Sequence, residues 1–160
     1  KEEAHLKIAL LAGVFDPPTL GHLDLIHRSH LICDRLIVAI AKNPNKHPLF
    51  SVEQRLKMLR EITRSFSHVQ IDVFEGLTLD YAKEKKVRFL LRGIRDANDL
   101  EYEAQMAQTH SRNGNLETVF FIGKHPQIQA RKIRELLQNG DSIEHLVPCE
   151  VASLITQWLK

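Results

Sequence analysis

Short apolar runs alternate along the chain with segments in which apolar residues recur at helical spacing. The runs contain many β-branched and aromatic residues, which favours strands. Between them, spacings such as Leu56, Leu59 and Ile62 favour helices, and Ser51 with Gln54 forms a capping box that predicts a helix start. The pattern predicts strands at 6–12, 35–41, 68–74, 87–92 and 116–122 and helices at 22–33, 52–65, 78–86, 98–111, 128–138 and 149–159.

Strands and helices that alternate in this way are typical of an α/β protein. Helices that connect successive strands imply parallel pairing with right-handed crossovers. We therefore predict a Rossmann-like, doubly wound, parallel five-stranded sheet with helices on both faces. No repeat, low-complexity tract or linker interrupts the pattern, so we expect residues 1–160 to form a single domain.

The composition is that of an ordinary globular protein, with 43% hydrophobic and 26% charged residues. A net charge of +2, from 22 basic and 20 acidic residues, does not indicate a nucleic-acid or acidic-membrane partner. No apolar run approaches the length of a membrane-spanning helix, and no signal peptide precedes the first strand. Cys33 and Cys149 fit no metal-binding pattern. We expect a cytoplasmic protein whose two cysteines are mostly buried, reduced thiols, with no membrane or nucleic-acid partner.

The first strand leads into residues 13–22, which read GVFDPPTLGH and precede a helix. Glycine lets the backbone approach a ligand closely, and the unpaired N–H groups at a helix start favour an anion. His22 could donate to a phosphate oxygen whose negative charge grows during a reaction. Ligands of such sheets bind at the carboxyl ends of the strands, where the strand order reverses. Gly13 and Gly93 end two strands that we expect to be neighbours, so the sequence predicts a phosphate-binding crevice between them.

Two basic residues near strand ends carry alternative interpretations. Lys46 lies in an irregular loop that contains two prolines, where it could bind an anion or be solvated. Arg92 ends a buried strand, where a guanidinium needs an anionic partner, either a ligand or a structural ion pair. Asp99 and Glu101, at the start of the next predicted helix, are also explained by the helix dipole alone.

Four segments resemble, in this order, motifs of the phosphopantetheine adenylyltransferases, a branch of the nucleotidyltransferases with a T/H-x-G-H motif. The segments are GVFDPPTLGH, NPNKHPLFSVEQR, FEGLTLDYA and RGIRDANDLEYEAQMA, and the resemblance extends from about Lys7 to about Trp158. It implies transfer of the adenylyl group of ATP to 4′-phosphopantetheine, which gives dephospho-coenzyme A and pyrophosphate. It also implies Mg²⁺ bound mainly through the ATP phosphates, coenzyme A as a further ligand, and a homo-oligomer, specifically a hexamer.

The resemblance implies roles for individual residues. His22 stabilises the transition state, and Lys46 and Arg92 neutralise the incoming phosphate. The implied ATP-binding residues are Val14, Phe15, His22, Gly93, Ile94, Arg95 and Glu103, with Gln129, Ala130 and Arg131 in a later segment. The implied acceptor-binding residues are Val14, Lys46, Thr78 and Arg92. No protein side chain is expected to hold the metal.

The chain departs from the family pattern at two places. Val14 stands where the family usually has threonine, so a hydroxyl that would contact a phosphate is missing. Residues 127–135 read QIQARKIRE where the family has a serine-rich helix start. The basic residues of this region could contact the triphosphate instead, or form a solvated face; they are Lys124, Arg131, Lys132 and Arg134. We expect activity to be retained, with the triphosphate bound differently.

Two other functions remain open at this stage. One is a related nucleotidyltransferase with another phosphate acceptor, although such relatives usually have H-x-G-H where this chain has Thr19 and His22. The other is a catalytically weakened homologue that binds coenzyme A or a nucleotide, which only Val14 and the missing serines support. His27 and His30 share a helix face, but a closed zinc site needs further ligands that the sequence does not place nearby.

Overall fold

The computed structural model describes residues 5–160; residues 1–4 of the predicted domain lie outside the described residues. Within residues 5–160, five parallel strands form one sheet in the order β3-β2-β1-β4-β5. The strands are β1 (Ile8–Gly13), β2 (Arg35–Lys42), β3 (Val69–Glu75), β4 (Phe89–Ile94) and β5 (Glu117–Ile122). The order reverses between β1 and β4, which is the doubly wound topology. The predicted fold class is confirmed.

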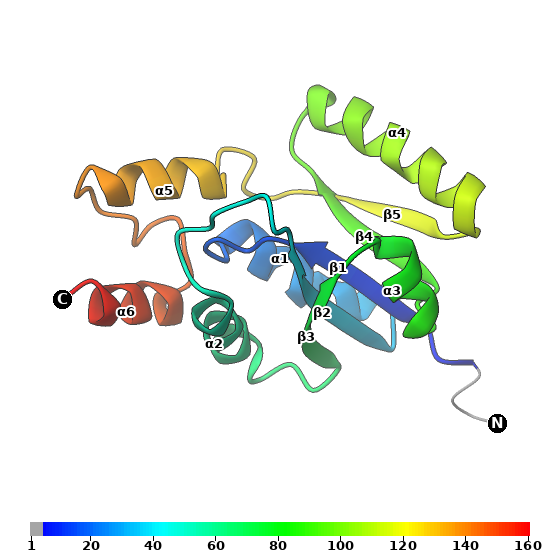
Figure 1. Ribbon diagram of the computed structural model, residues 1–160, viewed down its shortest axis with the longest axis horizontal. Helices are drawn as coiled ribbons and strands as arrows, with labels where there is room; N and C mark the ends of the chain where they lie inside the picture. Colours follow the sequence, from blue (N-terminus) through cyan, green and yellow to red (C-terminus); the bar gives the residue numbers. More distant parts are fainter. Residues whose placement is uncertain (1–4) are drawn as a thin grey trace.

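Helices cover both faces of the sheet (Figure 1). They are α1 (Leu20–Arg28), α2 (Val52–Thr63), α3 (Thr78–Glu84), α4 (Ala97–Gly114), α5 (Ala130–Gln138) and α6 (Cys149–Trp158), with a 3₁₀ turn η2 (Ser29–Leu31). One core lies between the sheet and α1, α2, α5 and α6, and a second lies on the opposite face under α3. None of the helices in the described part of the chain has the length and apolar character to cross a bilayer.

The central strand β2 shows why the apolar runs predicted strands correctly. Leu36, Val38 and Ile40 belong to one core, and Ile37 and Ala39 belong to the other. Successive side chains of a strand point to opposite faces, so a strand covered on both faces reads as a continuous apolar run. Such a run carries no alternation, and its length is what distinguishes it from a helix.

Several boundaries differ from the predicted ones. Helix α1 begins at Leu20 instead of residue 22, because Thr19 caps it, and it ends at Arg28 where η2 begins. Strand β4 continues through Ile94, so Gly93 lies inside a strand and not in the turn that follows. A Cβ at Gly93 would lie 2.9 Å from a methyl carbon of Leu25, so this glycine lets α1 pack closely on β4.

Two smaller predictions have opposite outcomes. Ser51 and Gln54 form the predicted capping box of α2, with each side chain accepting a hydrogen bond from the backbone N–H of the other residue.

Both cysteines are free, as expected, and Cys33 is buried. The prediction for Cys149 is wrong, because this residue is exposed at the first position of α6.

Candidate active site

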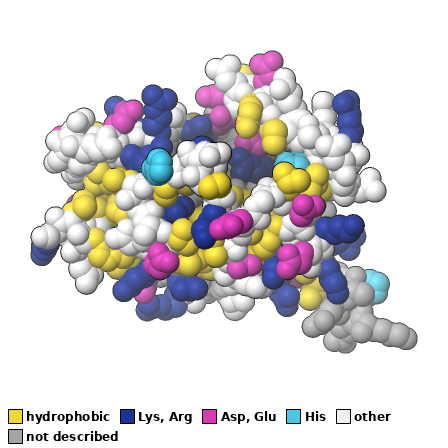
Figure 2. Space-filling view, viewed as in Figure 1, with side chains coloured by type: hydrophobic (Ala, Val, Ile, Leu, Met, Phe, Trp, Pro, Cys, Tyr) yellow, Lys and Arg dark blue, Asp and Glu magenta, His cyan; other side chains and the backbone are white. Residues whose placement is uncertain are grey.

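A hollow of about 520 Å³ opens at the carboxyl ends of β1 and β4, where the strand order reverses. Figure 2 shows this face of the molecule, with Lys and Arg side chains around the hollow. We call this hollow the crevice; its lining includes Gly13, Val14, Phe15, His22, Arg92, Gly93, Arg95, Asp99, Glu103, His125, Gln129, Ala130 and Arg134. Segments far apart in the sequence thus meet at the place that the two glycine-bearing strand ends predict.

His22 lies in the first turn of α1 and takes part in the cap of that helix. The Thr19 side-chain oxygen accepts the His22 backbone N–H at 3.3 Å, and the Thr19 backbone N–H is donated to Nδ1 of His22 at 2.9 Å. This is a capping box in which histidine replaces the usual glutamate or glutamine. Because Nδ1 accepts a hydrogen bond, the proton of the neutral ring lies on Nε2. Nε2–H is therefore available to donate to a ligand in the crevice.

The surroundings of His22 keep its ring uncharged. Burial, followed by the nearby charges of Arg92 and Arg95, lowers the pKa of His22 from 6.5 to about 4. The ring of Phe15, itself buried, lies edge-on to the imidazole with the two centroids 4.8 Å apart. At neutral pH the site thus presents a fixed, neutral N–H donor between two cations.

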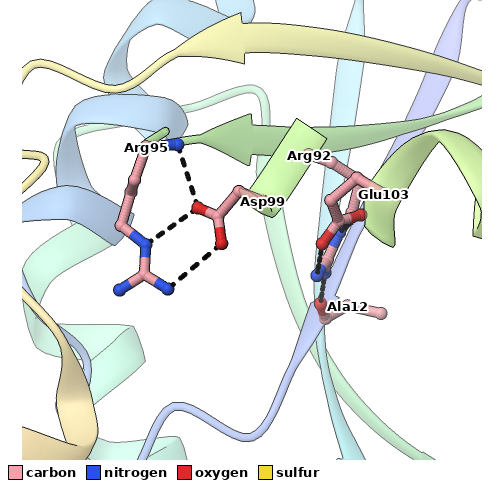
Figure 3. A network of polar contacts seen from close by, with 5 residues as sticks. All are labelled: Ala12, Arg92, Arg95, Asp99 and Glu103. Carbon is pink, nitrogen blue, oxygen red and sulfur yellow. Dashed lines mark hydrogen bonds and ion pairs between the residues drawn. The ribbon is translucent and has the colours of Figure 1, made fainter. Parts of the chain in front are cut away.

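Arg92 is held in place by Glu103, a residue of helix α4, which forms part of the crevice wall (Figure 3). Its Nε and Nη2 donate to the two carboxylate oxygens of Glu103 at 2.9 and 2.7 Å, and its Nη1 donates to the carbonyl of Ala12 at 2.9 Å. Burial opposes the charged form, but the hydrogen bonds to Glu103 prevail and raise the pKa of Arg92. The structural ion pair therefore exists, and the guanidinium also lines the crevice.

Arg95 and Asp99 form a second pair at the crevice rim (Figure 3). Arg95 donates to Asp99 Oδ2 from both its backbone N–H and its Nε, each at 3.0 Å. The side-chain hydrogen bond from Arg95 is the main cause of the lowered pKa of Asp99. Asp96 caps α4 by accepting the Asp99 backbone N–H at 2.8 Å. These acids stabilise the helix start and orient Arg95.

Lys46 lies apart from Arg92, in a second hollow of about 320 Å³. This hollow, which we call the lysine pocket, is lined by Val14, Ala41, Lys42, Asn43, Pro44, Lys46, Pro48, Val52, Arg55 and Glu75. Val14 lines both the crevice and the lysine pocket. The two cations predicted to hold one phosphate therefore face the turn after β1 from two sides.

Asp16 has a structural role in that turn. Its carboxylate is buried and accepts the backbone N–H groups of Leu49 and Phe50 at 2.8 and 2.9 Å. It thereby attaches the loop that carries Lys46 to the turn that follows β1. The geometry therefore gives Asp16 a role in fixing the turn and the loop to each other.

The start of α5 also lines the crevice. Gln129 and Ala130 line it, and Arg134 lines it too, donating from Nη1 to the Asp16 carbonyl at 2.9 Å. Arg131 is outside the lining, with its side chain 81% exposed and paired with Glu135. Lys132 and Lys124 are also exposed. Of the four basic residues of this region, Arg134 is the one that faces the crevice.

The remaining predicted residues lie beside the crevice. Thr78 begins α3 and lines a third hollow of about 200 Å³ with His110 and Thr118. The hydroxyl of Thr118 is buried with no hydrogen-bond partner among the described residues. Ile94 has a buried side chain, and its carbonyl accepts the Gly123 backbone N–H at 2.9 Å.

Sequence reasoning missed three residues that the structure places at these hollows. Thr19 escaped because the capping-box pattern expects glutamate or glutamine, not histidine, three residues later. Arg55 resembles a solvated residue of an amphipathic helix but is 3% exposed. His125 lies in a loop where no motif marks it, yet it lines the crevice. Tertiary packing places these residues at the hollows, and no local sequence pattern predicts that packing.

The chemistry available in the crevice is the binding of anions and the stabilisation of developing negative charge. Neither serine nor cysteine is among the described residues that line it, and the one hydroxyl of that lining, on Thr19, accepts the His22 backbone N–H in the helix cap. The three acids of the lining already have partners: Asp16 bonds backbone N–H groups, Asp99 pairs with Arg95, and Glu103 pairs with Arg92. Between residues 5 and 160, no group of three or more His, Cys, Asp or Glu side chains is arranged to hold a metal ion.

Comparisons with known proteins agree with this chemistry. The family model for cytidylyltransferase-like proteins matches residues 10–136. A phosphopantetheine adenylyltransferase of Cyanothece sp. is 45% identical over 148 residues, which are 91% of this chain and 88% of that protein. Enzymes of the same name from Nostoc punctiforme and Gloeothece citriformis are each 45% identical, over 94% and 93% of this chain and 84% and 97% of their own lengths.

Proposed function

The chain belongs to the cytidylyltransferase-like family and, within it, to the phosphopantetheine adenylyltransferases, and on this premise we propose which of its residues carry out each part of the reaction. The enzyme transfers the adenylyl group of ATP to 4′-phosphopantetheine and gives dephospho-coenzyme A, a step of coenzyme A biosynthesis. A phosphate oxygen of the acceptor attacks the α-phosphorus of ATP, and the bond to the leaving pyrophosphate breaks.

His22 is the residue that we assign to the transition state. The observation that carries this assignment is the bond from the Thr19 N–H to Nδ1, which leaves the ring proton on Nε2. Nε2–H then donates to a non-bridging oxygen of the α-phosphate, where negative charge increases as the new bond forms. A phosphate is already ionised at neutral pH, so the reaction needs no side-chain base. Positioning and charge stabilisation are sufficient.

The acceptor phosphate is proposed to lie against Val14, between Arg92 and Lys46. Arg92 reaches it from the crevice and Lys46 from the lysine pocket. Thr78, beside the third hollow, is proposed to contact the rest of the acceptor. The bidentate pair with Glu103 restricts the orientation of Arg92, so the guanidinium is already positioned when the phosphate arrives.

ATP is proposed to occupy the crevice itself. Phe15, Gly93 and Arg95 line it near His22, and Gln129 and Ala130 line it at the start of α5. Glu103 contributes through Arg92, and Ile94 contributes through its backbone. We assign Arg134 to the triphosphate in place of Arg131, because Arg134 lines the crevice and Arg131 does not.

Mg²⁺ is proposed to enter with ATP, bound mainly by its phosphates. The carboxylates of the crevice are occupied by backbone N–H groups and by arginines, which fits a site that receives the metal on its substrate. When bound, a divalent cation offsets the charge of the triphosphate. The protein's own cations, Arg92, Arg95 and Arg134, attract the anion whether or not the metal is bound.

A hexameric assembly and a cytoplasmic location are further proposals. Large apolar side chains are exposed on α4 and at the end of β5: Leu100 (47%), Tyr102 (63%), Met106 (38%) and Ile122 (72%). An exposed apolar group of this kind is typical of a surface that contacts another protein. Light scattering after size-exclusion chromatography measures the assembly directly, and a monomeric mass would contradict it.

The proposed roles are tested by measuring pyrophosphate release with ATP, Mg²⁺ and a panel of acceptors. We expect release with 4′-phosphopantetheine and little release with nicotinate mononucleotide or glycerol phosphate. Preference for another acceptor would favour the related nucleotidyltransferases. Calorimetric binding of phosphopantetheine without any release would indicate a homologue that only binds.

A further inference from the structure

Arg55 is a buried cation in the first turn of α2 that bonds only to backbone carbonyls. Its Nε donates to the carbonyls of Phe50 and Ser51 at 2.9 and 3.3 Å, and its Nη1 donates to the carbonyl of Val14 at 3.0 Å. Its side chain forms no ion pair with a carboxylate of residues 5–160. Burial lowers the pKa of the guanidinium, which the more distant charge of Asp16 partly offsets.

A buried charge without a counter-ion destabilises the folded state. Arg55, which is 3% exposed, is such a charge. It lines the lysine pocket together with Lys46 and Val14, and no described residue accepts a hydrogen bond from its Nη2. A cation arranged in this way is explained if an anion binds beside it.

The bonds of Arg55 also join two segments that carry proposed substrate contacts. Val14 belongs to the turn after β1, and Phe50 belongs to the end of the loop that carries Lys46. Asp16 joins the same two segments as a hydrogen-bond acceptor, because its carboxylate accepts the backbone N–H groups of Leu49 and Phe50. With Arg55 donating and Asp16 accepting, the turn and the loop are fixed relative to each other.

We propose that Arg55 is a positioning residue for the acceptor phosphate: it holds the Val14 turn against the Lys46 loop and adds, behind the phosphate, a positive charge that no described carboxylate pairs with directly. This inference rests on the proposed function, because it presumes that the acceptor phosphate lies against Val14. It explains how the site attracts a phosphate although position 14 lacks a hydroxyl. Arg55 itself does not touch the α-phosphorus or the leaving group.

The test compares Arg55→Met and Arg55→Lys with Met58→Ala, a fully buried residue of the same helix that lies outside all three hollows. Arg55→Met is expected to raise the KM for phosphopantetheine about tenfold or more and to change the KM for ATP by less than about threefold. Arg55→Lys keeps the charge but lacks the planar fork with which Arg55 bonds the three carbonyls. Its KM is therefore expected to lie between those of the wild type and Arg55→Met.

Met58→Ala is the control for a purely structural effect. It is expected to lower the melting temperature and leave both KM values within about twofold of the wild type. The inference is overturned if folded Arg55 variants keep the wild-type KM for phosphopantetheine, or if both KM values rise together. If Arg55→Met does not fold, Arg55→Lys decides the same question.

Failure of the inference and failure of the proposed function give different results. If the wild type does not release pyrophosphate from ATP and phosphopantetheine, the proposed function is wrong. Calorimetric titration with phosphopantetheine then tests Arg55 alone. Weaker binding by Arg55→Lys than by the wild type supports the inference, and equal binding, or no binding by either protein, rejects it.

Discussion

Replacement of His22 tests the link between the helix cap and the chemistry. The imidazole makes one bond to the Thr19 N–H through Nδ1 and presents Nε2–H to the crevice. Glutamine is a preferred residue at this position of a capping box. His22→Gln therefore preserves the capping box and removes the imidazole donor, whereas His22→Ala removes the donor and the half of the box that the ring makes, and leaves the bond from the residue 22 backbone N–H to the Thr19 side chain.

The two effects differ in size and in the quantity that reports them. Loss of one donor to a developing negative charge lowers kcat about 10²- to 10³-fold. Loss of the hydrogen bond from the Thr19 N–H to the ring costs about 1 kcal/mol, which lowers the melting temperature of a chain of this length by about 2–4 °C. Both variants are thus expected to lose the rate, and His22→Ala alone is expected to lose the stability.

The assay is steady-state pyrophosphate release at saturating ATP and phosphopantetheine, with thermal unfolding followed by circular dichroism. Calorimetry shows whether the variants still bind ATP, which they should do with little change. A His22→Ala variant that keeps more than about a third of the wild-type kcat would refute the assignment of Nε2–H to the transition state. Equal melting temperatures for His22→Ala and the wild type would refute the role of the ring in the cap.

Three more outcomes are expected. Because the pKa of His22 falls from 6.5 to about 4 on folding, the unfolded chain binds the extra proton between these values. The free energy of unfolding should therefore fall by up to about 3 kcal/mol as the pH decreases from 6.5 to 4, and urea titrations of His22→Gln should lack this component. Val14→Thr should lower the KM for phosphopantetheine about two- to tenfold in the same kinetic assay, as one added hydrogen bond would; a higher KM would contradict the placement of the phosphate. Arg134→Gln should raise the KM for ATP about tenfold, while the exposed control Lys132→Gln should not, and equal effects would favour a diffuse surface charge.

The fold could be predicted from the sequence because both faces of the sheet are covered. Leu36, Val38 and Ile40 serve one core and Ile37 serves the other, so β2 appears as one uninterrupted apolar run. Helix starts were predictable where the capping residues follow the usual pattern, as with Ser51 in α2. The start of α1 was missed because His22 stands where the capping-box pattern expects glutamate or glutamine. Such patterns are defined by residue types and not by the hydrogen bonds that the residues make.

The site was predictable at the strand ends and not beyond them. Gly13 and Gly93 had to meet because parallel neighbouring strands end at the same edge of the sheet. The pairing of Arg92 with Glu103 depends on how α4 returns over β4, which no local spacing encodes. Arg134 lines the crevice because tertiary packing buries the neighbouring Ile133 and so fixes the rotation of α5 about its axis. The sequence of α5 alone does not predict that rotation.

The use of histidine in the cap of α1 follows from the charge of the ligand. Glutamate at this position would satisfy the Thr19 N–H but place a negative charge against a phosphate. Glutamine would be neutral and its amide carries both an acceptor and a donor, but this amide lies at the end of a longer and more flexible side chain than an imidazole. An imidazole has two nitrogens on different sides of a rigid ring, so it can accept from Thr19 and donate to the ligand at once. Protonation of Nδ1 would break the cap, and the lowered pKa of His22 prevents this at neutral pH. We therefore propose that Arg92 and Arg95 have two effects: they attract the anionic substrate, and they help to keep the nearby ring in the neutral form that both of its bonds require.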